Sequence, residues 1–298
     1  MPNRKDVEFD VGGGVRLRGW LFVPATGARA YPAITMAHGF AGVKEHRLEV
    51  YAKAFADRGF VVLVHDHRNF GASDGTPRND IDPWQQITDW RRAISFLESQ
   101  DCVDPQKIGL WGSSYAGGHA IVLGATDRRL RCVVAQVPTI SGYEQSLRRV
   151  PPDKVAVLEE SFSEDERALF RGEPPRTQMV VSMDASVPAA YRARDAHDFY
   201  LMSAAKATWQ NSVTIRSSRA ARMYEPGTWV SRVSPTPLLM IVATHDTITL
   251  TDTALTAYER ALHPKRLVTI EGGHFDAYVA MFERSSGAAL EWFVEHLR

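Results

Sequence analysis

The chain has 298 residues, of which 44% are hydrophobic and 23% are charged, so it can bury one large core or two small ones. Its 35 basic and 35 acidic side chains balance, which leaves no general field for nucleic acid or an anionic membrane surface. Aromatic residues at 10% argue against disorder, and no apolar run approaches the roughly 18 residues of a membrane span. We therefore expect catalysis or small-molecule binding, with no nucleic-acid or membrane partner.

Two further features bear on location and chemistry. The N-terminus reads MPNRKDVEFD and has no apolar core segment, so we do not expect a signal peptide. Cys102 and Cys132 are too few for a disulfide framework and lack metal-ligand spacing. These observations predict a cytoplasmic protein and leave its oligomeric state open.

Short apolar runs alternate with helix-like stretches along most of the chain. Residues 7–11 and 15–23 flank a triple-glycine turn and are expected to pair as antiparallel strands. The later runs are almost wholly apolar, which is typical of strands buried on both faces of a parallel sheet. They span residues 33–37, 60–64, 108–111, 132–137, 238–242 and 267–270. This pattern predicts an α/β fold with a doubly wound, mostly parallel sheet of eight strands.

Three helices of this alternation can be located. The clearest begins at Asp82-Pro83, an N-cap followed by proline, and runs to Leu97. The other two are expected at about 252–262 and 287–297.

The alternation is interrupted once, between residues 139 and 234. No clear buried strand occurs there, and helix-like stretches cover about 153–170 and 188–207. An unstructured loop of this length is implausible in a compact domain. We therefore predict a helical cap at 139–234, inserted into a core formed by 1–138 and 235–298.

The segment IGLWGSSYAGGH, residues 108–119, predicts a sharp strand-to-helix turn that carries a serine nucleophile. Such a turn needs small residues two positions before and after the serine, because the chain passes close to itself. With Ser114 as nucleophile these positions hold Gly112 and Ala116. Ser113 would place two aromatic residues there, so we favour Ser114. The alternative interpretation is an ordinary glycine-rich turn.

A serine hydroxyl is a weak nucleophile that needs a base, and the base needs an orienting acid. His274 follows a strand and two glycines, and Asp246 lies just past the preceding strand, both at the edge where open α/β sheets build sites. Asp252 is the alternative acid, although it looks more like a helix N-cap. Asp276 is too close in sequence to His274, and His245 is interpreted as a neighbour of the acid.

Acyl transfer also needs N–H donors for the developing oxyanion, typically worth about 3 to 4 kcal/mol each. One is expected to be the backbone amide of Tyr115, at the helix N-terminus. The second is expected from the His38-Gly39-Phe40 loop, where glycine permits a tight turn and the Phe40 amide would point into the pocket.

These segments together resemble the α/β-hydrolase superfamily over nearly the whole chain. The matching features are HGF after one strand, DHRNFGASDG after the next, GSSYAGG, and then an aspartate and a histidine in that order. The tyrosine after the serine and the size of the insertion resemble the branch that holds dienelactone-hydrolase-like, X-prolyl-peptidase-like and polyketide-transferase-like proteins. The stretch 66–75 resembles the family's D-x-R-G-x-G-x-S loop with two extra residues, which implies a bracing role. A competing interpretation makes His65, Asp66 and His67 metal ligands, but further ligands are not evident.

The resemblance implies a serine hydrolase that cleaves a carboxylic ester or thioester through an acyl-enzyme on Ser114, with His274 as base. No metal, nucleotide or flavin cofactor is expected, since no P-loop or Rossmann fingerprint occurs. Two alternatives stay open: an acyltransferase or C–C bond hydrolase with the same triad, and a non-catalytic scaffold that binds a ligand or partner.

The substrate is expected to be a small acyl compound held under the cap. Tyr200, Met202 and Trp209 are our candidates for lining an acyl site, and the competing interpretation is that they pack the cap onto the sheet. Four cap arginines would either pair with a substrate carboxylate or cover a solvated helix face. These are Arg148, Arg149, Arg192 and Arg194.

Overall fold

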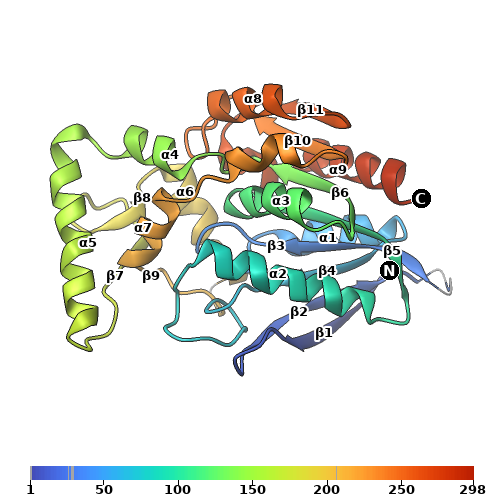
Figure 1. Cartoon of the computed structure of the whole chain (residues 1–298), viewed down its shortest axis with the longest axis horizontal. Helices are drawn as coiled ribbons and strands as arrows, with labels where there is room; N and C mark the ends of the chain where they lie inside the picture. Colours follow the sequence, from blue (N-terminus) through green and yellow to red (C-terminus); the bar gives the residue numbers. More distant parts are fainter. Residues whose placement is uncertain (1, 26, 28–29, 206) are drawn as a thin grey trace.

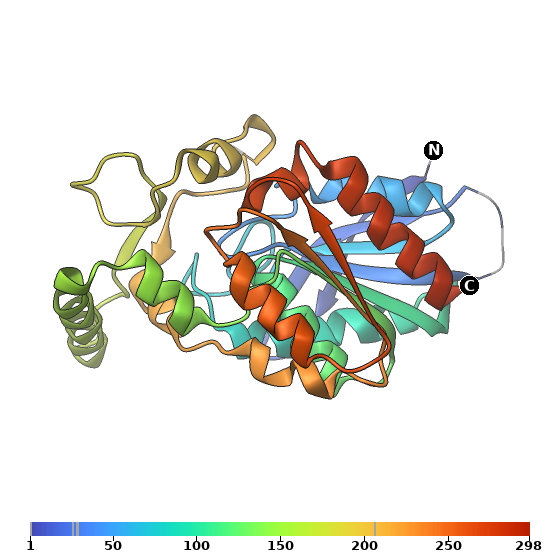
Figure 2. The same ribbon diagram turned by 90° about the horizontal axis from the view of Figure 1, so that it is seen from above.

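An eight-stranded sheet forms the centre of the computed structural model, which describes residues 2–25, 27, 30–205 and 207–298 (Figures 1 and 2). The strand order is β1-β2-β4-β3-β5-β6-β10-β11. β2 pairs antiparallel with β1 and β4, and the other neighbours are parallel. The strands are β1 (Asn3–Asp10), β2 (Arg16–Val23), β3 (Tyr31–Ala37), β4 (Val61–His65), β5 (Val103–Ser113), β6 (Leu130–Gln136), β10 (Leu238–Ala243) and β11 (Lys265–Ile270). The predicted doubly wound, mostly parallel sheet is confirmed.

Helices cover both faces of this sheet (Figure 2). α1 (Leu48–Asp57) and α9 (Phe282–Leu297) pack on one face. The opposite face carries α2 (Pro83–Glu98), α3 (Tyr115–Thr126) and α8 (Thr251–Arg260). Every residue of β4 and β10 is consequently buried, which explains their unbroken apolar sequences. Asp82 caps α2 through its side chain, as the sequence predicts.

The order of the strands positions the site. The chain passes from β3 to β4 on one side and later returns to β5 on the other side of β3. The loops that follow β3 and β5 therefore diverge and leave a crevice at the carboxyl ends of these strands, where open α/β sheets bind ligands. The crevice lies between the nucleophile turn and the loop predicted to stabilise the oxyanion.

Most of the segment between β6 and β10 lies beyond this end of the sheet, at the left of Figure 1, whereas its last part, residues 226–232, packs against α3 and α8. Its helices are α4 (Gly142–Arg149), α5 (Val155–Phe170), α6 (Arg194–Tyr200) and α7 (Ile215–Arg222). It also contains a small sheet that the sequence did not predict, formed by β7 (Thr177–Val181), β8 (Ala189–Tyr191) and β9 (Val213–Thr214). The stretch 188–207 begins with β8 rather than with a helix, and β8 and β9 are too short to show an apolar period.

Short 3-10 helices complete the chain: η1 (Pro152–Lys154), η2 (Ser203–Ala205), η3 (Pro226–Arg232) and η4 (His274–Tyr278). In the part of the chain that the structure describes, no helix has both the length and the apolar character needed to cross a bilayer.

Candidate active site

Ser114 occupies the sharp turn between β5 and α3, with φ 59° and ψ −120°. Few non-glycine residues adopt a positive φ, and such strain persists only where the surroundings enforce it. Here the Ser114 amide donates to the Gln136 carbonyl and its own carbonyl accepts from Thr139, both at 2.9 Å. A Cβ on Gly112 would lie 2.0 Å from the carbonyl oxygen of Ala116, so the turn requires glycine there.

The fold brings Ser114, His274 and Asp246 into one hydrogen-bonded row. The Nε2 atom of His274 lies 3.0 Å from Oγ of Ser114, across 160 residues of sequence. The Nδ1 atom lies 2.7 Å from Oδ2 of Asp246. The Asp246 carboxylate can only accept a hydrogen bond, so Nδ1 of His274 must carry the imidazole proton and donate it. Nε2 is then free to accept the proton of the serine hydroxyl. All three side chains are buried.

The environment of Asp246 keeps this carboxyl ionised. Burial alone raises its pKa, but the attraction of His274 and hydrogen bonds from His274 and Thr249 outweigh burial, so the pKa falls to about 2. Oδ1 accepts the amides of Ile248 and Thr249 at 2.8 Å, and Oδ2 accepts the Thr249 hydroxyl at 2.7 Å. Thr249 was not among the predicted residues. Thr249 lies three positions after an aspartate, and aspartates often accept hydrogen bonds from the residues that follow them in a turn. This spacing is the signal in the sequence that points to Thr249.

The other titratable candidates lie away from this row. Asp252 is exposed in the first turn of α8, not at its N-cap, and its carboxylate binds Arg148 at 2.6 and 2.8 Å. The carboxylate of Asp276 accepts the Gly273 amide at 2.7 Å, at the start of η4. His245 is exposed beside a glutamate. Among the described residues none of these side chains is hydrogen-bonded to His274.

The loop after β3 passes directly over the nucleophile. A Cβ on Gly39 would lie 2.9 Å from Cβ and 3.3 Å from Oγ of Ser114, so only glycine permits this approach. Phe40 and Tyr115 line the same pocket as the serine, and their rings meet edge to face with centroids 5.7 Å apart. The two residues predicted as oxyanion donors therefore both lie beside the nucleophile, and their rings are in contact.

Three consecutive carbonyls of this loop each accept a hydrogen bond from a side chain. The donors are His38 Nδ1 to Gly39 at 2.9 Å, Tyr200 Oη to Phe40 at 2.6 Å, and Trp209 Nε1 to Ala41 at 2.7 Å. His38 can donate from Nδ1 because its Nε2 accepts the backbone amide of His67. In a trans peptide the N–H points opposite to the C=O, so holding the Gly39 carbonyl fixes the direction of the Phe40 amide.

This arrangement corrects one prediction. We expected the acyl site to be lined by Tyr200, Met202 and Trp209. None of them is among the described residues that line the pocket beside Ser114. Tyr200 and Trp209 instead stack on each other, with centroids 5.6 Å apart, behind the loop after β3. Met202 packs against the core. Buried Tyr and Trp side chains need partners for their polar tips, and the loop carbonyls supply them.

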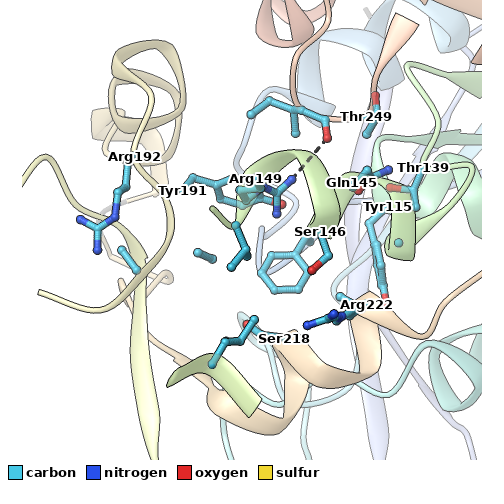
Figure 3. A pocket seen from close by; sticks show the side chains of 18 of the residues that line it. Tyr115, Thr139, Gln145, Ser146, Arg149, Tyr191, Arg192, Ser218, Arg222 and Thr249 are labelled. Atoms are coloured by element: carbon cyan, nitrogen blue, oxygen red, sulfur yellow. Dashed lines mark hydrogen bonds between the residues drawn. The ribbon is translucent and has the colours of Figure 1, made fainter. Parts of the chain in front are cut away.

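The pocket beside Ser114 has a volume of about 320 Å³ and lies between core and insertion (Figure 3). Two of the four candidate arginines, Arg149 and Arg192, are in its wall; the other two form ion pairs elsewhere. Gln145 and Arg222 also lie in this wall, although neither was predicted from the sequence. Gln145 lies four residues before Arg149, a spacing that places both on one face of α4.

The loop after β4 acts as a brace. Asp66 is fully buried and accepts hydrogen bonds from the amide and ammonium of Lys44 and from the amide of Ala72. Within the described ranges, no group of three or more His, Cys, Asp or Glu side chains is placed to hold a metal ion.

The sheet, the nucleophile turn and the inserted segment together define an α/β hydrolase. The family model of the X-Pro dipeptidyl-peptidase (S15 family) matches residues 13–276, and the chain belongs to this family. The superfamily branch that the sequence resembled is thereby confirmed.

Named relatives show the range of activities near this chain. The quorum-quenching protein AidA of Acinetobacter baumannii (strain MDR-ZJ06) is 31% identical over 283 residues, covering 94% of this chain and 90% of AidA. A thiohydrolase of Eupenicillium brefeldianum is 32% identical over 279 residues, covering 92% and 88%. The polyketide transferase grgF of Penicillium sp. is 30% identical over 295 residues, covering 99% and 97%. The crystal structure of the α/β hydrolase GrgF matches with a TM-score of 0.85, 29% identity and 99% coverage of both chains.

Proposed function

We propose that this enzyme cleaves a carboxylic ester or thioester through an acyl-enzyme on Ser114. The observation that carries the proposal is the unbroken row of hydrogen bonds from Asp246 through His274 to Ser114, at a pocket that can hold an acyl group. Residues 139–234 act as a cap in this proposal, because α4, α7 and β8 supply the outer wall of the pocket.

In the proposed mechanism each of these residues has one role. Nε2 of His274 takes the proton of Ser114 as Oγ attacks the carbonyl carbon, and Asp246 stabilises the imidazolium. The amides of Phe40 and Tyr115 hydrogen-bond the oxyanion. When the tetrahedral intermediate collapses, His274 gives its proton to the leaving alkoxide or thiolate. A water molecule, deprotonated by His274, then attacks the acyl carbon and releases the acid, and Oγ recovers its proton.

Two related functions need separate consideration. A hydroxyl compound could replace water as acyl acceptor, and the similarity to a polyketide transferase favours this second candidate. Cleavage after an X-Pro dipeptide is less well supported. Its substrate carries an N-terminal ammonium group, whereas Arg149 and no acidic residue occur in the wall of the pocket that the structure describes.

The test is a panel of 4-nitrophenyl esters and acyl N-acetylcysteamine thioesters of increasing chain length. We expect Ser114→Ala to lower kcat by about 10⁴-fold or more, by analogy with other serine hydrolases. Ser146→Ala is the matched control, because this serine lines the pocket without joining the hydrogen-bonded row. Equal rates in Ser114→Ala and the unmodified chain would refute the proposal. Faster ester formation than hydrolysis with an added alcohol would favour the transferase, and turnover of Ala-Pro-4-nitroanilide would favour the peptidase.

A further inference from the structure

The pocket beside Ser114 concentrates positive charge in a chain whose net charge is zero. Arg149 from α4, Arg192 directly after β8 and Arg222 from α7 lie in its wall. No Asp or Glu belongs to the part of this wall that the structure describes. Basic and acidic residues balance over the whole chain, so the excess of arginine in this wall is a local feature of the pocket.

The three arginines differ in how far their donors are already used. Arg192 donates to the carbonyls of Asp184 and Val187 at 2.7 and 2.6 Å, and its guanidinium points away from the cavity in Figure 3. Arg222 lies 2.8 Å from Glu159, which is half exposed. Arg149 makes a hydrogen bond of 3.3 Å to the Ile248 carbonyl, drawn in Figure 3, and its guanidinium carbon lies 4.8 Å from the centre of the Tyr191 ring.

Arg149 therefore has N–H donors that remain available to a ligand. A guanidinium offers five N–H groups in a rigid fork that matches a carboxylate. Its neighbour Arg148 already uses that fork on Asp252, with two bonds of 2.6 and 2.8 Å. For Arg149 no carboxylate partner is found among the described residues. The two adjacent arginines can therefore be compared directly. Arg148 forms an ion pair outside the pocket, whereas Arg149 lies in the pocket wall without a carboxylate partner among the described residues.

Unpaired buried donors occur in the same wall. The Tyr115 hydroxyl and the Gln145 amide nitrogen are buried and have no hydrogen-bond acceptor among the described residues. Nη1 of Arg222 approaches Glu159 as an ion pair without hydrogen-bond geometry. Buried polar groups are nearly always hydrogen-bonded, so donors left over in a pocket wall indicate acceptor atoms on the ligand.

We propose that the acyl group of the substrate carries a second carboxylate, which Arg149 and Arg222 bind in this pocket while Tyr115 and Gln145 donate neutral hydrogen bonds. The substrate class is then the monoester or monothioester of a dicarboxylic acid. This inference rests on the proposed ester or thioester cleavage. A volume of about 320 Å³ is at the small end of ligand pockets, and suits a short dicarboxylic acyl group better than a nucleotide-bearing leaving group.

A matched pair of substrates tests this assignment. Mono-4-nitrophenyl adipate and 4-nitrophenyl hexanoate share their leaving group and chain length and differ in the terminal carboxylate. We expect kcat/KM to favour the adipate ester by about tenfold to hundredfold, as charge-assisted hydrogen bonds imply. In Arg149→Met this preference falls to near unity, and in Arg149→Lys part of it returns. Arg148→Met, which removes the neighbouring charge outside the pocket, keeps the preference of the unmodified chain.

Several outcomes overturn the proposal. Hexanoate cleavage that depends on Ser114, without any preference for adipate, refutes the dicarboxylate and leaves the hydrolase proposal standing. A preference for coenzyme A thioesters over N-acetylcysteamine thioesters that disappears in Arg149→Met places the anion on the leaving group, and refutes the acyl assignment.

A binding measurement decides the inference even if neither ester is cleaved. Calorimetric titration of Ser114→Ala with monomethyl adipate and with methyl hexanoate compares two esters that differ in the terminal carboxylate, without turnover. Binding of monomethyl adipate at least tenfold tighter than that of methyl hexanoate, and lost in the double variant with Arg149→Met, supports the carboxylate site. Equal affinity for the two esters refutes it.

Discussion

Asp246 and Asp252 differ by six positions in sequence, and their surroundings give them different roles. Asp246 is buried and accepts two backbone amides, a threonine hydroxyl and the His274 imidazole. Asp252 is exposed and contacts an arginine on the surface. The sequence could narrow the acid to these two carboxylates, because both follow β10. Only the packing of the loop against His274 distinguishes them.

Exchanging each carboxylate for an amide tests this distinction. Asp246→Asn keeps the volume but presents a neutral group that no longer holds the proton on Nδ1 of His274, so we expect kcat to fall by about 10⁴-fold. Asp252→Asn changes kcat by less than about twofold, because an exposed ion pair contributes little. Steady-state rates are compared after circular dichroism shows that both variants fold. The reverse ranking of the two variants would assign the acid to Asp252.

At the scale of single elements, the loop after β3 is held from both sides. Gly39 lies against Ser114 on one side, and the carbonyls on the other side accept side-chain donors. In the proposed mechanism, these contacts keep the Phe40 amide directed at the substrate without movement of the loop during the reaction, as electrostatic stabilisation of an oxyanion requires.

Gly39→Ala should displace this loop, because its new methyl group meets Ser114 at 2.9 Å. We expect kcat/KM to fall by about a hundredfold or more, the usual effect of losing an oxyanion donor. Gly42→Ala is the control, since a Cβ there would find its nearest neighbour at 3.5 Å and fit without strain. Comparable losses in the two variants would mean that general loop flexibility, and not the approach to Ser114, sets the rate.

Tyr200→Phe separates bracing from substrate binding. Removing the hydroxyl leaves the Phe40 carbonyl without this donor, which costs about 1 to 3 kcal/mol and loosens the loop. We expect kcat to fall by about tenfold for esters of every chain length, with KM nearly unchanged. A KM that rises for long acyl chains alone would restore the original prediction that Tyr200 lines the acyl site.

These elements also show which parts of the fold can be predicted from the sequence. Apolar runs such as β4 and β10 are predictable because a strand buried on both faces needs an unbroken apolar sequence. The nucleophile turn is predictable because sterics dictate glycine at 112. The strands β8 and β9 have three and two residues, too few for any period. Tyr200 and Trp209 could not be placed because an aromatic ring with a polar tip suits a pocket or a packed interior equally well.

At the scale of the whole molecule, the core contains a group of buried histidines beneath the active site. The rings of His38, His65 and His119 surround His67, with centroids 4.7, 5.4 and 5.7 Å from it. Burial lowers the pKa of His38 and His46 to about 4, and that of His65 and His119 to about 3. These imidazoles are therefore neutral in the folded protein over the physiological range.

This group makes the fold sensitive to acid. An unfolded histidine titrates near 6.5, so below that pH the unfolded chain binds more protons than the folded one, and stability falls as pH falls. Each such histidine removes about 1.4 kcal/mol of unfolding free energy per pH unit, until the folded pKa is reached. The low pKa of Asp246 stabilises the fold above the unfolded value of 3.8, and this contribution is lost only as the pH falls below that value. It therefore does not change the stability between pH 5 and pH 8.

Urea unfolding followed by tryptophan fluorescence at pH 8, 7, 6 and 5 measures this effect. We expect a nearly constant free energy of unfolding down to about pH 6.5, and a loss of several kcal/mol by pH 5. His65→Leu should reduce the slope by about one proton, because both ring nitrogens of His65 lack partners in the described residues and no hydrogen bond is lost. His263→Gln, which removes an exposed imidazole outside the core, is the control. A free energy that stays constant to pH 5 would show that the core accepts protons without unfolding, and that burial does not hold these imidazoles neutral.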